Sequence, residues 1–446
     1  MNTITIDIKN TNGKIKPVNA VNNGPHSMSV RGISNFEAYK ALEIPYARNH
    51  DASFYSGFGG EHTVDVHRIF KNFDADENDP ASYVFGPTDE YTKNTFAAGT
   101  KVYYRLGASI EHGYKEGTYP PPDYLKWARI CEHIIRHYTE GWANGFFLDI
   151  EYWEIWNEPD CINPDGSNPC WQGTSDQFND FYCTAAIYLK EKFPHLKIGG
   201  PAFASVNGAS EQFVSDFLHE VKRRNAPLDF FSFHGYLKDA DKLLKRISSA
   251  EKHLKEAGFS DMEMHYNEWN YVRGWLGEDY KYSRIQSKKL KGASLITSIM
   301  CAGQASPLYM MMYYDARPGA WCGLFNTDFL DPLKPYYAFY LFRELPRLGD
   351  YIEVPFRQGN IYSCAATNGE DAAIILTNYS DNDTAPAEDA TLVVKNLSGR
   401  ARAEIYLLDE DHNAELIREK TFNADDATVK LNIPLFTTYL IKIIKE

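Results

Sequence analysis

Two glutamates in the sequence stand where a pair of carboxyl groups could do chemistry together. Glu158 lies in the motif WNEP (156–159), and Glu268 follows 110 residues later in YNEWN (266–270); each motif closes a β-rich segment. A carboxyl group that stays protonated can act as a general acid, while an ionised one can act as a nucleophile. Two carboxyl groups that face each other across a pocket are the minimum requirement for hydrolysing a glycosidic bond.

Two further glutamates, Glu151 and Glu154, precede Glu158 in the same segment. Because side chains alternate along a strand, Glu154 shares the face of Glu158 but lies deeper, whereas Glu151 faces the other way. We therefore predict Glu158 and Glu268 as the catalytic pair. The alternative is that both are ordinary exposed glutamates at strand ends.

Other β-rich segments also end in polar side chains. ARNHD (47–51) contributes Arg48, and SFHGY (232–236) contributes Tyr236. An Arg or a Tyr beside a nucleophilic carboxylate would keep it ionised and oriented. Side chains that could donate hydrogen bonds to sugar hydroxyls are His50, Asn157 and His234. Each histidine could equally be a structural residue with its hydrogen bonds satisfied.

Metal chemistry has weak support in the sequence. A zinc site built from His50, His234 and Asp51 is conceivable, but these residues have no HxxxH-type spacing among them, so we expect no metal. The seven cysteines are scattered without a CxxC motif, which suits reduced thiols. Cys161 and Cys170 could bridge the loop between them, and the sequence leaves that open.

Aromatic residues make up 14% of the chain, a content that fits either sugar stacking or core packing. Their positions distinguish the two uses better than their number does. Several lie at or beyond the expected strand ends, where a sugar pocket would form: Trp156, Tyr236, Trp269, Trp275, Tyr313, Tyr314 and Trp321.

The elements that would position these residues alternate between strands and helices. Eight β-rich segments with helical stretches between several of them predict an α/β protein with a (β/α)8 TIM barrel. A doubly wound open sheet is the alternative, but no Gly-rich phosphate fingerprint follows the first segment. The eight segments are 16–24, 43–51, 101–109, 147–159, 196–204, 228–236, 262–270 and 307–315.

The pattern changes near residue 350, where short strands separated by turns replace the alternation. We predict a catalytic barrel over 10–345 and a C-terminal all-β sandwich accessory domain over 346–446, which the N-terminal strand 1–9 could complete.

The 446-residue chain carries a formal net charge of −14, which argues against a nucleic-acid partner. No stretch approaches the roughly 18 consecutive apolar residues that span a bilayer, and the first residues lack the apolar region of a secretory signal. We therefore expect a cytoplasmic protein with no membrane partner, assuming that the sequence begins at its natural start.

With these motifs in place, the chain resembles the retaining glycoside hydrolases of clan A, most closely family 39, the β-xylosidase and α-L-iduronidase family. The strand-four motif is the most specific of the matches, and GGPA alone is weak. The matching motifs are NNGP (22–25), ARNHD (47–51), YWEIWNEPD (152–160), GGPA (199–202), DFFSFHGY (229–236) and NEW (267–269).

The resemblance implies a role for each matching residue. Glu158 would be the acid/base, Glu268 the nucleophile, and Asn157 would bind the sugar 2-hydroxyl, with His50, His234 and Tyr236 nearby. The implied mechanism is double displacement with retention, carboxyl groups about 5–5.5 Å apart and no cofactor. The expected substrates are xylo-oligosaccharides or other β-xylosides, cleaved in exo fashion. Self-association is plausible, although no surface for a homo-oligomer can be identified.

The sequence departs from the family pattern at two strands. Strand eight lacks the usual Trp, which Trp321 could replace, and strand three carries Arg105 where a Glu is commoner. The glycone is therefore open, and an α-L-arabinofuranosidase or another pentosidase is the alternative. Uronide specificity is less favoured, although Arg48, Arg105 and Arg317 could pair with a carboxylate. An inactive carbohydrate-binding barrel and a phosphate-binding barrel enzyme are the remaining alternatives.

Overall fold

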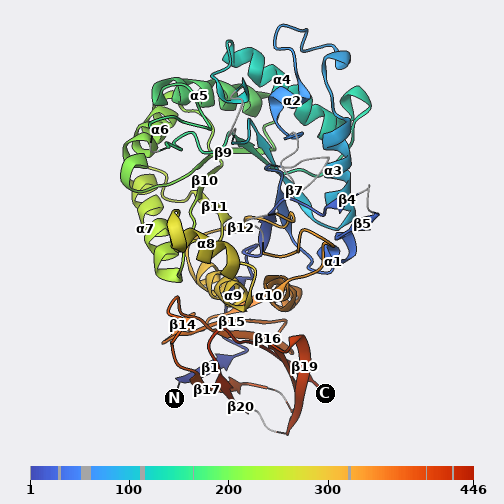
Figure 1. The fold of residues 1–446 in the computed structure, drawn as a ribbon, viewed down its shortest axis with the longest axis vertical. Coiled ribbons are helices and arrows are strands. Elements are labelled where there is room, and N and C mark those ends of the chain that lie inside the picture. The colour runs from blue at the N-terminus through green and yellow to red at the C-terminus, as the bar shows by residue number, and fades with distance from the viewer. Residues whose placement is uncertain are drawn as a thin grey trace.

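A computed structural model describes residues 2–28, 32–51, 62–110, 116–163, 165–319, 323–397, 399–423 and 426–446. Eight parallel strands close into a barrel at the centre of the molecule (Figure 1). They coincide with the eight predicted segments, so the (β/α)8 prediction is confirmed. In chain order the barrel strands are β3 (Ala20–Asn22), β6 (Tyr46–Arg48), β7 (Lys101–Leu106), β8 (Tyr152–Ile155), β9 (Lys197–Phe203), β10 (Phe230–His234), β11 (Glu263–Trp269) and β12 (Met310–Tyr313).

Helices surround the barrel, as Figure 1 shows. Their ends follow local chemistry: Asp123 caps the helix 124–140 through Lys126 N, and Gly141 ends it in a left-handed conformation with φ of 76°. The helix 175–192 begins with a capping box between Thr174 and Gln177. The helices are α1 (Phe36–Lys40), α2 (Val66–Ile69), α3 (Gly86–Ala97), α4 (Tyr124–Glu140), α5 (Ser175–Lys192), α6 (Glu211–Arg224), α7 (Ala240–Glu256), α8 (Gly277–Gln286), α9 (Leu290–Ala305), α10 (Lys334–Phe342) and α11 (Glu344–Leu348).

The barrel interior changes character along its axis. A compact apolar cluster fills one level of it, formed by Ala20, Tyr103, Tyr152, Phe230, Met310 and Met312. Toward the carboxyl ends of the strands, charged and amide side chains replace the apolar ones, including buried Arg48 and Glu154. The apolar level lies below the polar side chains, which face the carboxyl ends of the strands, where active sites of such barrels are found.

An all-β region packs beside α9 and α10, and both chain termini lie in it (Figure 1). Its larger sheet has the order β19-β18-β21-β16-β15-β13-β2, with β14 paired to β15. The smaller sheet has the order β1-β17-β20, and Ile4 and Ile6 of β1 share one apolar cluster with Ile374 and Ile441 of the larger sheet. The N-terminal strands β1 and β2 therefore pair with the C-terminal strands β17 and β13. The division into a barrel over 10–345 and a sandwich over 346–446 stays a prediction. The strands are β1 (Asn2–Asp7), β2 (Thr11–Lys14), β13 (Asp350–Ile352), β14 (Arg357–Gln358), β15 (Ile361–Thr367), β16 (Ala372–Asn378), β17 (Glu388–Lys395), β18 (Arg400–Leu408), β19 (Asn413–Asn423), β20 (Ala427–Ile433) and β21 (Thr438–Lys445).

Two short strands, β4 (Ser27–Met28) and β5 (Ile33–Ser34), pair with each other outside these sheets. Among the described residues, no helix has both the length and the apolar character needed to cross a membrane.

Candidate active site

The loop that follows β8 presents Glu158 at the mouth of the barrel. Trp156 and Glu158 both have positive φ, 79° and 47°, and the backbone N–H of Glu158 donates to the carbonyl of Ala202 at 2.9 Å. Gly107 at the end of β7 lies against this turn, since a Cβ there would stand 3.0 Å from Cα of Trp156. A backbone held in this sparsely populated conformation is typical of a functional site.

An irregularity in β11 turns Glu268 into the barrel. Asn267 already points inward, because its amide Nδ2 donates to Oε1 of Glu154 at 2.5 Å. Regular alternation would send Glu268 outward, but the pairing register of β11 shifts against both neighbouring strands at this point. Two successive side chains therefore reach the interior, as a bulge allows.

The structure brings the carboxyl groups of Glu158 and Glu268 together. One oxygen of each lies within 4.8 Å of the other and of a ring nitrogen of His234. Nδ1 of His234 lies 2.8 Å from Oε1 of Glu158 and 3.5 Å from Oε2 of Glu268. Burial lowers the pKa of His234 to about 4, so the imidazole is neutral and bridges the pair without adding charge.

Arg48 ties Glu268 to the buried polar residues beneath it. Its Nε donates to Oε2 of Glu154 at 2.6 Å, and its Nη1 lies 3.5 Å from Oε2 of Glu268. The remaining guanidinium contacts go to the side-chain oxygens of Asn22, at 3.1 Å, and Asn157, at 2.7 Å. Asn157 is therefore held beside both glutamates by a fully buried guanidinium.

Tyr236 donates a hydrogen bond to Oε1 of Glu268. His50 lies near the other carboxylate oxygen, with Nε2 3.9 Å from Oε2 of Glu268 and 3.4 Å from Asp51. The Tyr314 hydroxyl donates to Oδ2 of Asp51 at 2.7 Å, so this residue borders the same group. The predicted residues Arg48, His50, Asn157, His234, Tyr236 and Tyr314 thus surround the two carboxyl groups.

Burial raises the pKa of both carboxyl groups to about 7. For Glu268, the Arg48 guanidinium and the Tyr236 hydrogen bond oppose this rise, and the nearby Glu158 adds to it. For Glu158 the charge of Arg48 opposes it, and Asp51 adds to it. Two carboxyl groups this close resist double ionisation, so near neutral pH the pair shares one proton. Because Tyr236 and Arg48 donate to Glu268 and stabilise its negative charge, the shared proton is favoured on Glu158.

The aromatic residues divide into two sets. Trp269 is fully buried, with its ring 5.3 Å from that of Tyr313 in the apolar layer between strands and helices. The structure therefore does not bring Trp269 to the carboxyl pair, and Trp156 is likewise buried, packed against Trp171. Tyr236 does reach the site, and the half-exposed Trp275 packs on its ring at 5.0 Å. The predicted Trp321 lies outside the described residues.

The three arginines considered for a uronide carboxylate each face an acidic group of the protein. Arg48 pairs with Glu154, and Arg105 donates to Oδ1 of Asp65 at 2.5 Å. Arg317 lies 3.4 Å from Asp315. Their charges are thus already balanced within the protein.

Sequence reasoning missed the residues that support the pair. Glu154 accepts from Arg48, Asn267 and Ser232, so it organises the polar interior instead of reacting. Strand alternation already placed Glu154 deeper than Glu158 on the same face, but its partners are visible only in three dimensions. Asp160 is the other missed group: its oxygens accept from Ala204 N and Ser205 N, which fixes the loop that carries Glu158.

The chain is similar to known proteins in sequence and in fold. Residues 90–281 match the family model described as glycosyl hydrolases family 39. The predicted resemblance to glycoside hydrolase family 39 is confirmed. The chain is also 26% identical over 178 residues to a "Beta-xylosidase" of Geobacillus stearothermophilus, an alignment that covers 35% of this chain and 33% of that protein. It is 26% identical over 196 residues to a "Beta-xylosidase" of Caldicellulosiruptor saccharolyticus, an alignment that covers 40% of this chain and 36% of that protein.

These alignments span about a third of the length of the two curated relatives. Similar solved structures cover the chain fully. A glucosidase from Croceicoccus marinus has a TM-score of 0.81 at 20% identity, with 100% of this chain and 99% of that one covered. A monomeric beta-xylosidase from Caulobacter crescentus CB15 has a TM-score of 0.73 at 15% identity, with full coverage of both. At these identities the likeness shows the fold alone, a (β/α)8 barrel with an all-β region.

Proposed function

We propose that this family 39 relative is a retaining glycoside hydrolase with Glu158 as acid/base and Glu268 as nucleophile. The observation that carries the proposal is the approach of the two carboxyl groups to within 4.8 Å at the open end of the barrel. Retaining enzymes keep their carboxyl groups about 5–5.5 Å apart, whereas inverting enzymes leave about 6.5–9.5 Å for a water molecule. The short separation favours retention.

The division of roles follows from the hydrogen bonds. A nucleophile must be ionised, and Glu268 has the Tyr236 hydroxyl and the Arg48 guanidinium to stabilise its charge. A general acid must hold a proton at the working pH, and burial raises the pKa of Glu158 to about 7. The Glu158 side chain is also the more exposed, at 15% against 8%, which suits proton delivery to a leaving group at the mouth.

The reaction then proceeds in two displacements. In the first, an oxygen of Glu268 attacks the anomeric carbon while Glu158 transfers its proton to the departing glycosidic oxygen. In the second, ionised Glu158 takes a proton from water, whose oxygen attacks the anomeric carbon and releases Glu268 as a carboxylate. Each step inverts the anomeric centre, so the product retains the starting configuration. The amide of Asn157, held by Arg48, is placed to bind a sugar hydroxyl beside the reacting carbon.

The proposed substrates are β-xylosides, including xylo-oligosaccharides, cleaved from the non-reducing end. The support comes from the two curated relatives named as β-xylosidases. The three arginines that could bind a uronide carboxylate are paired with acidic groups of the protein. Because none of these three arginine charges is left for a substrate carboxylate, the site suits a neutral sugar.

A panel of nitrophenyl pentosides and hexosides in both anomeric forms tests the proposal. The expected result is fastest turnover of the β-xyloside, with the β-anomer of xylose as the first product detected by proton NMR. First appearance of the α-anomer would overturn the retaining mechanism. Fastest turnover of an α-L-arabinofuranoside or a β-glucoside would leave the mechanism standing and replace the substrate.

A further inference from the structure

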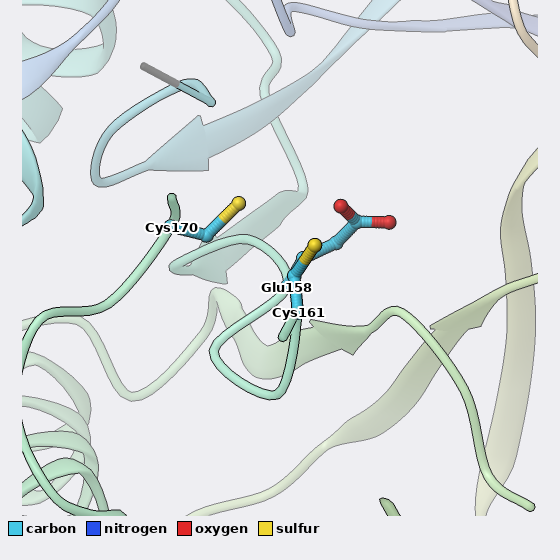
Figure 2. A group of neighbouring side chains, drawn as sticks. All are labelled: Glu158, Cys161 and Cys170. Carbon is cyan, nitrogen blue, oxygen red and sulfur yellow. The ribbon is translucent and has the colours of Figure 1, made fainter. Parts of the chain in front are cut away.

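Two cysteine thiols lie against the acid/base carboxyl group of Glu158. The sulfur atoms of Cys161 and Cys170 and one carboxylate oxygen of Glu158 all lie within 4.8 Å of one another. Figure 2 shows the two sulfur atoms and the carboxylate extending to the same side of the loop that carries Cys161. Both cysteines are free thiols in this structure. Neither thiol takes part in the hydrolytic mechanism proposed above.

The backbone around the three side chains is fixed by hydrogen bonds. Cys161 N donates to the carbonyl of Glu158 at 3.0 Å, and the indole Nε1 of Trp156 donates to the carbonyl of Cys170 at 3.0 Å. The side chain of Asn168 joins the two ends of the loop, because its Nδ2 donates to Pro159 O and its Oδ1 accepts from Cys170 N. The group is therefore preorganised by contacts that do not depend on a ligand.

The donor set fits a thiophilic divalent cation. Zn²⁺ binds thiolate sulfur at about 2.3 Å and carboxylate oxygen at about 2.0–2.2 Å, which places tetrahedral ligands about 3.5–3.8 Å apart. Separations within 4.8 Å reach that geometry with side-chain movements of about 1 Å. Two sulfur donors favour Zn²⁺ over the hard cations Mg²⁺ and Ca²⁺. Three protein ligands would leave a fourth position for water.

We propose that Cys161, Cys170 and Glu158 form an inhibitory site for Zn²⁺ or a cation of the same class. Binding displaces the thiol protons to solvent and holds Glu158 ionised against the metal. The carboxyl group then has no proton to give to a leaving group, so hydrolysis stops until the cation is removed. This step rests on the proposed role of Glu158, whereas the binding site itself does not.

Two of the three ligand side chains are partly accessible to solvent. The Glu158 side chain is 15% exposed and Cys161 is partly exposed, while Cys170 is buried behind them. The hydrogen bond with Cys161 and burial both raise the pKa of the Cys170 thiol, so without a cation this residue is a neutral thiol. A second cluster, formed by Glu158, His234 and Glu268, competes for the same cation through the shared carboxylate. The test must therefore separate the two clusters.

Cobalt binding separates them without reference to activity. The protein is kept reduced with a phosphine and titrated with Co²⁺, and the thiolate-to-cobalt charge-transfer band in the near ultraviolet is followed. We expect one equivalent bound with this band in the wild type, and loss of the band in Cys161→Ala and Cys170→Ala. The control Cys183→Ala removes a buried thiol from α5, outside this cluster, and should keep the band. Binding without the band, or no binding, overturns the proposal.

Inhibition by Zn²⁺ is then measured against each protein's own zinc-free rate, with reversal by EDTA. Loss of a supporting residue around a metal typically weakens affinity 10–100-fold, so loss of a direct ligand should raise the inhibitory concentration at least about tenfold. Equal inhibition of wild type, Cys161→Ala and Cys170→Ala would place the cation on the His234 cluster and overturn the site. If cobalt binds through thiolates but no glycoside is hydrolysed, the metal site stands and the proposed function fails.

Discussion

The hydroxyl of Tyr236 donates a hydrogen bond to Oε1 of Glu268, the oxygen that Arg48 does not reach. Both carboxylate oxygens of Glu268 therefore have a donor, while its neighbour Glu158 depends on a neutral imidazole. Hydrogen bonds to an ionised carboxylate lower its pKa, so this arrangement assigns the negative charge of the pair to Glu268. The assignment of chemical roles rests on this asymmetry.

Glu268→Ala should abolish glycoside hydrolysis, with kcat lower by at least about 10³-fold, because no group remains to form the covalent intermediate. Added azide should restore turnover and yield a glycosyl azide of inverted configuration, which proton NMR identifies. The control is Glu263→Ala, at the opposite end of β11, where the side chain pairs with Lys197. Turnover by Glu268→Ala at the control's rate would remove this residue from the mechanism.

Glu158→Ala should give a different pattern, because acid catalysis matters less for a good leaving group. We expect a large loss of kcat/KM on an alkyl or sugar aglycone and a much smaller one on a dinitrophenyl aglycone. Azide should give a product of retained configuration. Glu151→Ala is the control, since this residue precedes β8 and faces Lys197. A loss that is equal for both aglycones would contradict the acid/base role.

Much of this arrangement could be predicted from the chain alone. The eight barrel strands follow from alternating apolar segments, and Glu158 and Glu268 stand out because motif residues at strand ends meet at one face of a barrel. Arg48 and Tyr236 could be placed beside Glu268 by the same reasoning.

Other features depend on local departures from regular structure. Strand alternation puts consecutive residues on opposite faces, so it cannot foresee that a register shift in β11 brings Asn267 and Glu268 to the same side. The same shift leaves Trp269 in the outer apolar layer. Its place at a strand end predicts contact with a sugar, but the structure turns its ring away from the carboxyl pair. Cys161 and Cys170 are nine positions apart without a metal motif, and only the folded loop brings them to Glu158.

Tyr236→Phe should move the acidic limb of the pH profile. Activity requires Glu268 ionised and Glu158 protonated, so kcat/KM rises as pH increases through the pKa of Glu268 and falls as it increases through that of Glu158. The Tyr236 hydrogen bond lowers the pKa of Glu268. Removing it should raise that pKa and shift the acidic limb upward by about 1 pH unit, given the typical strength of hydrogen bonds to charged groups. Tyr182→Phe, whose hydroxyl donates to Pro227 O, is the control. A downward shift, or no shift, would contradict the hydrogen bond's role.

Glu158→Gln should stabilise the protein at alkaline pH. Burial raises the folded-state pKa of Glu158 from an ordinary 4.5 to about 7, so the folded protein binds this proton more tightly than the unfolded chain. That contribution to stability is complete below pH 4.5 and is lost as pH rises toward 7. Glutamine avoids the loss, so its advantage should grow between pH 5 and 8 to about 3 kcal/mol. Chemical denaturation at several pH values measures it, with Glu151→Gln as control. An advantage that is constant with pH would count against a raised pKa.

Gly107→Ala should disturb the turn that carries Glu158. Gly107 has φ of 138°, a conformation nearly restricted to glycine, and a Cβ there would stand 3.0 Å from Cα of Trp156. We expect the free energy of unfolding to fall by about 2 kcal/mol and kcat to fall by up to about 10²-fold, because misplacing a reacting group by about 1 Å has that effect. Gly99→Ala is a matched control, since Gly99 also has positive φ, 83°, but nothing lies within 4 Å of its Cβ position. The control should lose stability and keep kcat. Equal effects of the two substitutions on kcat would show that the contact with Trp156 does not position Glu158.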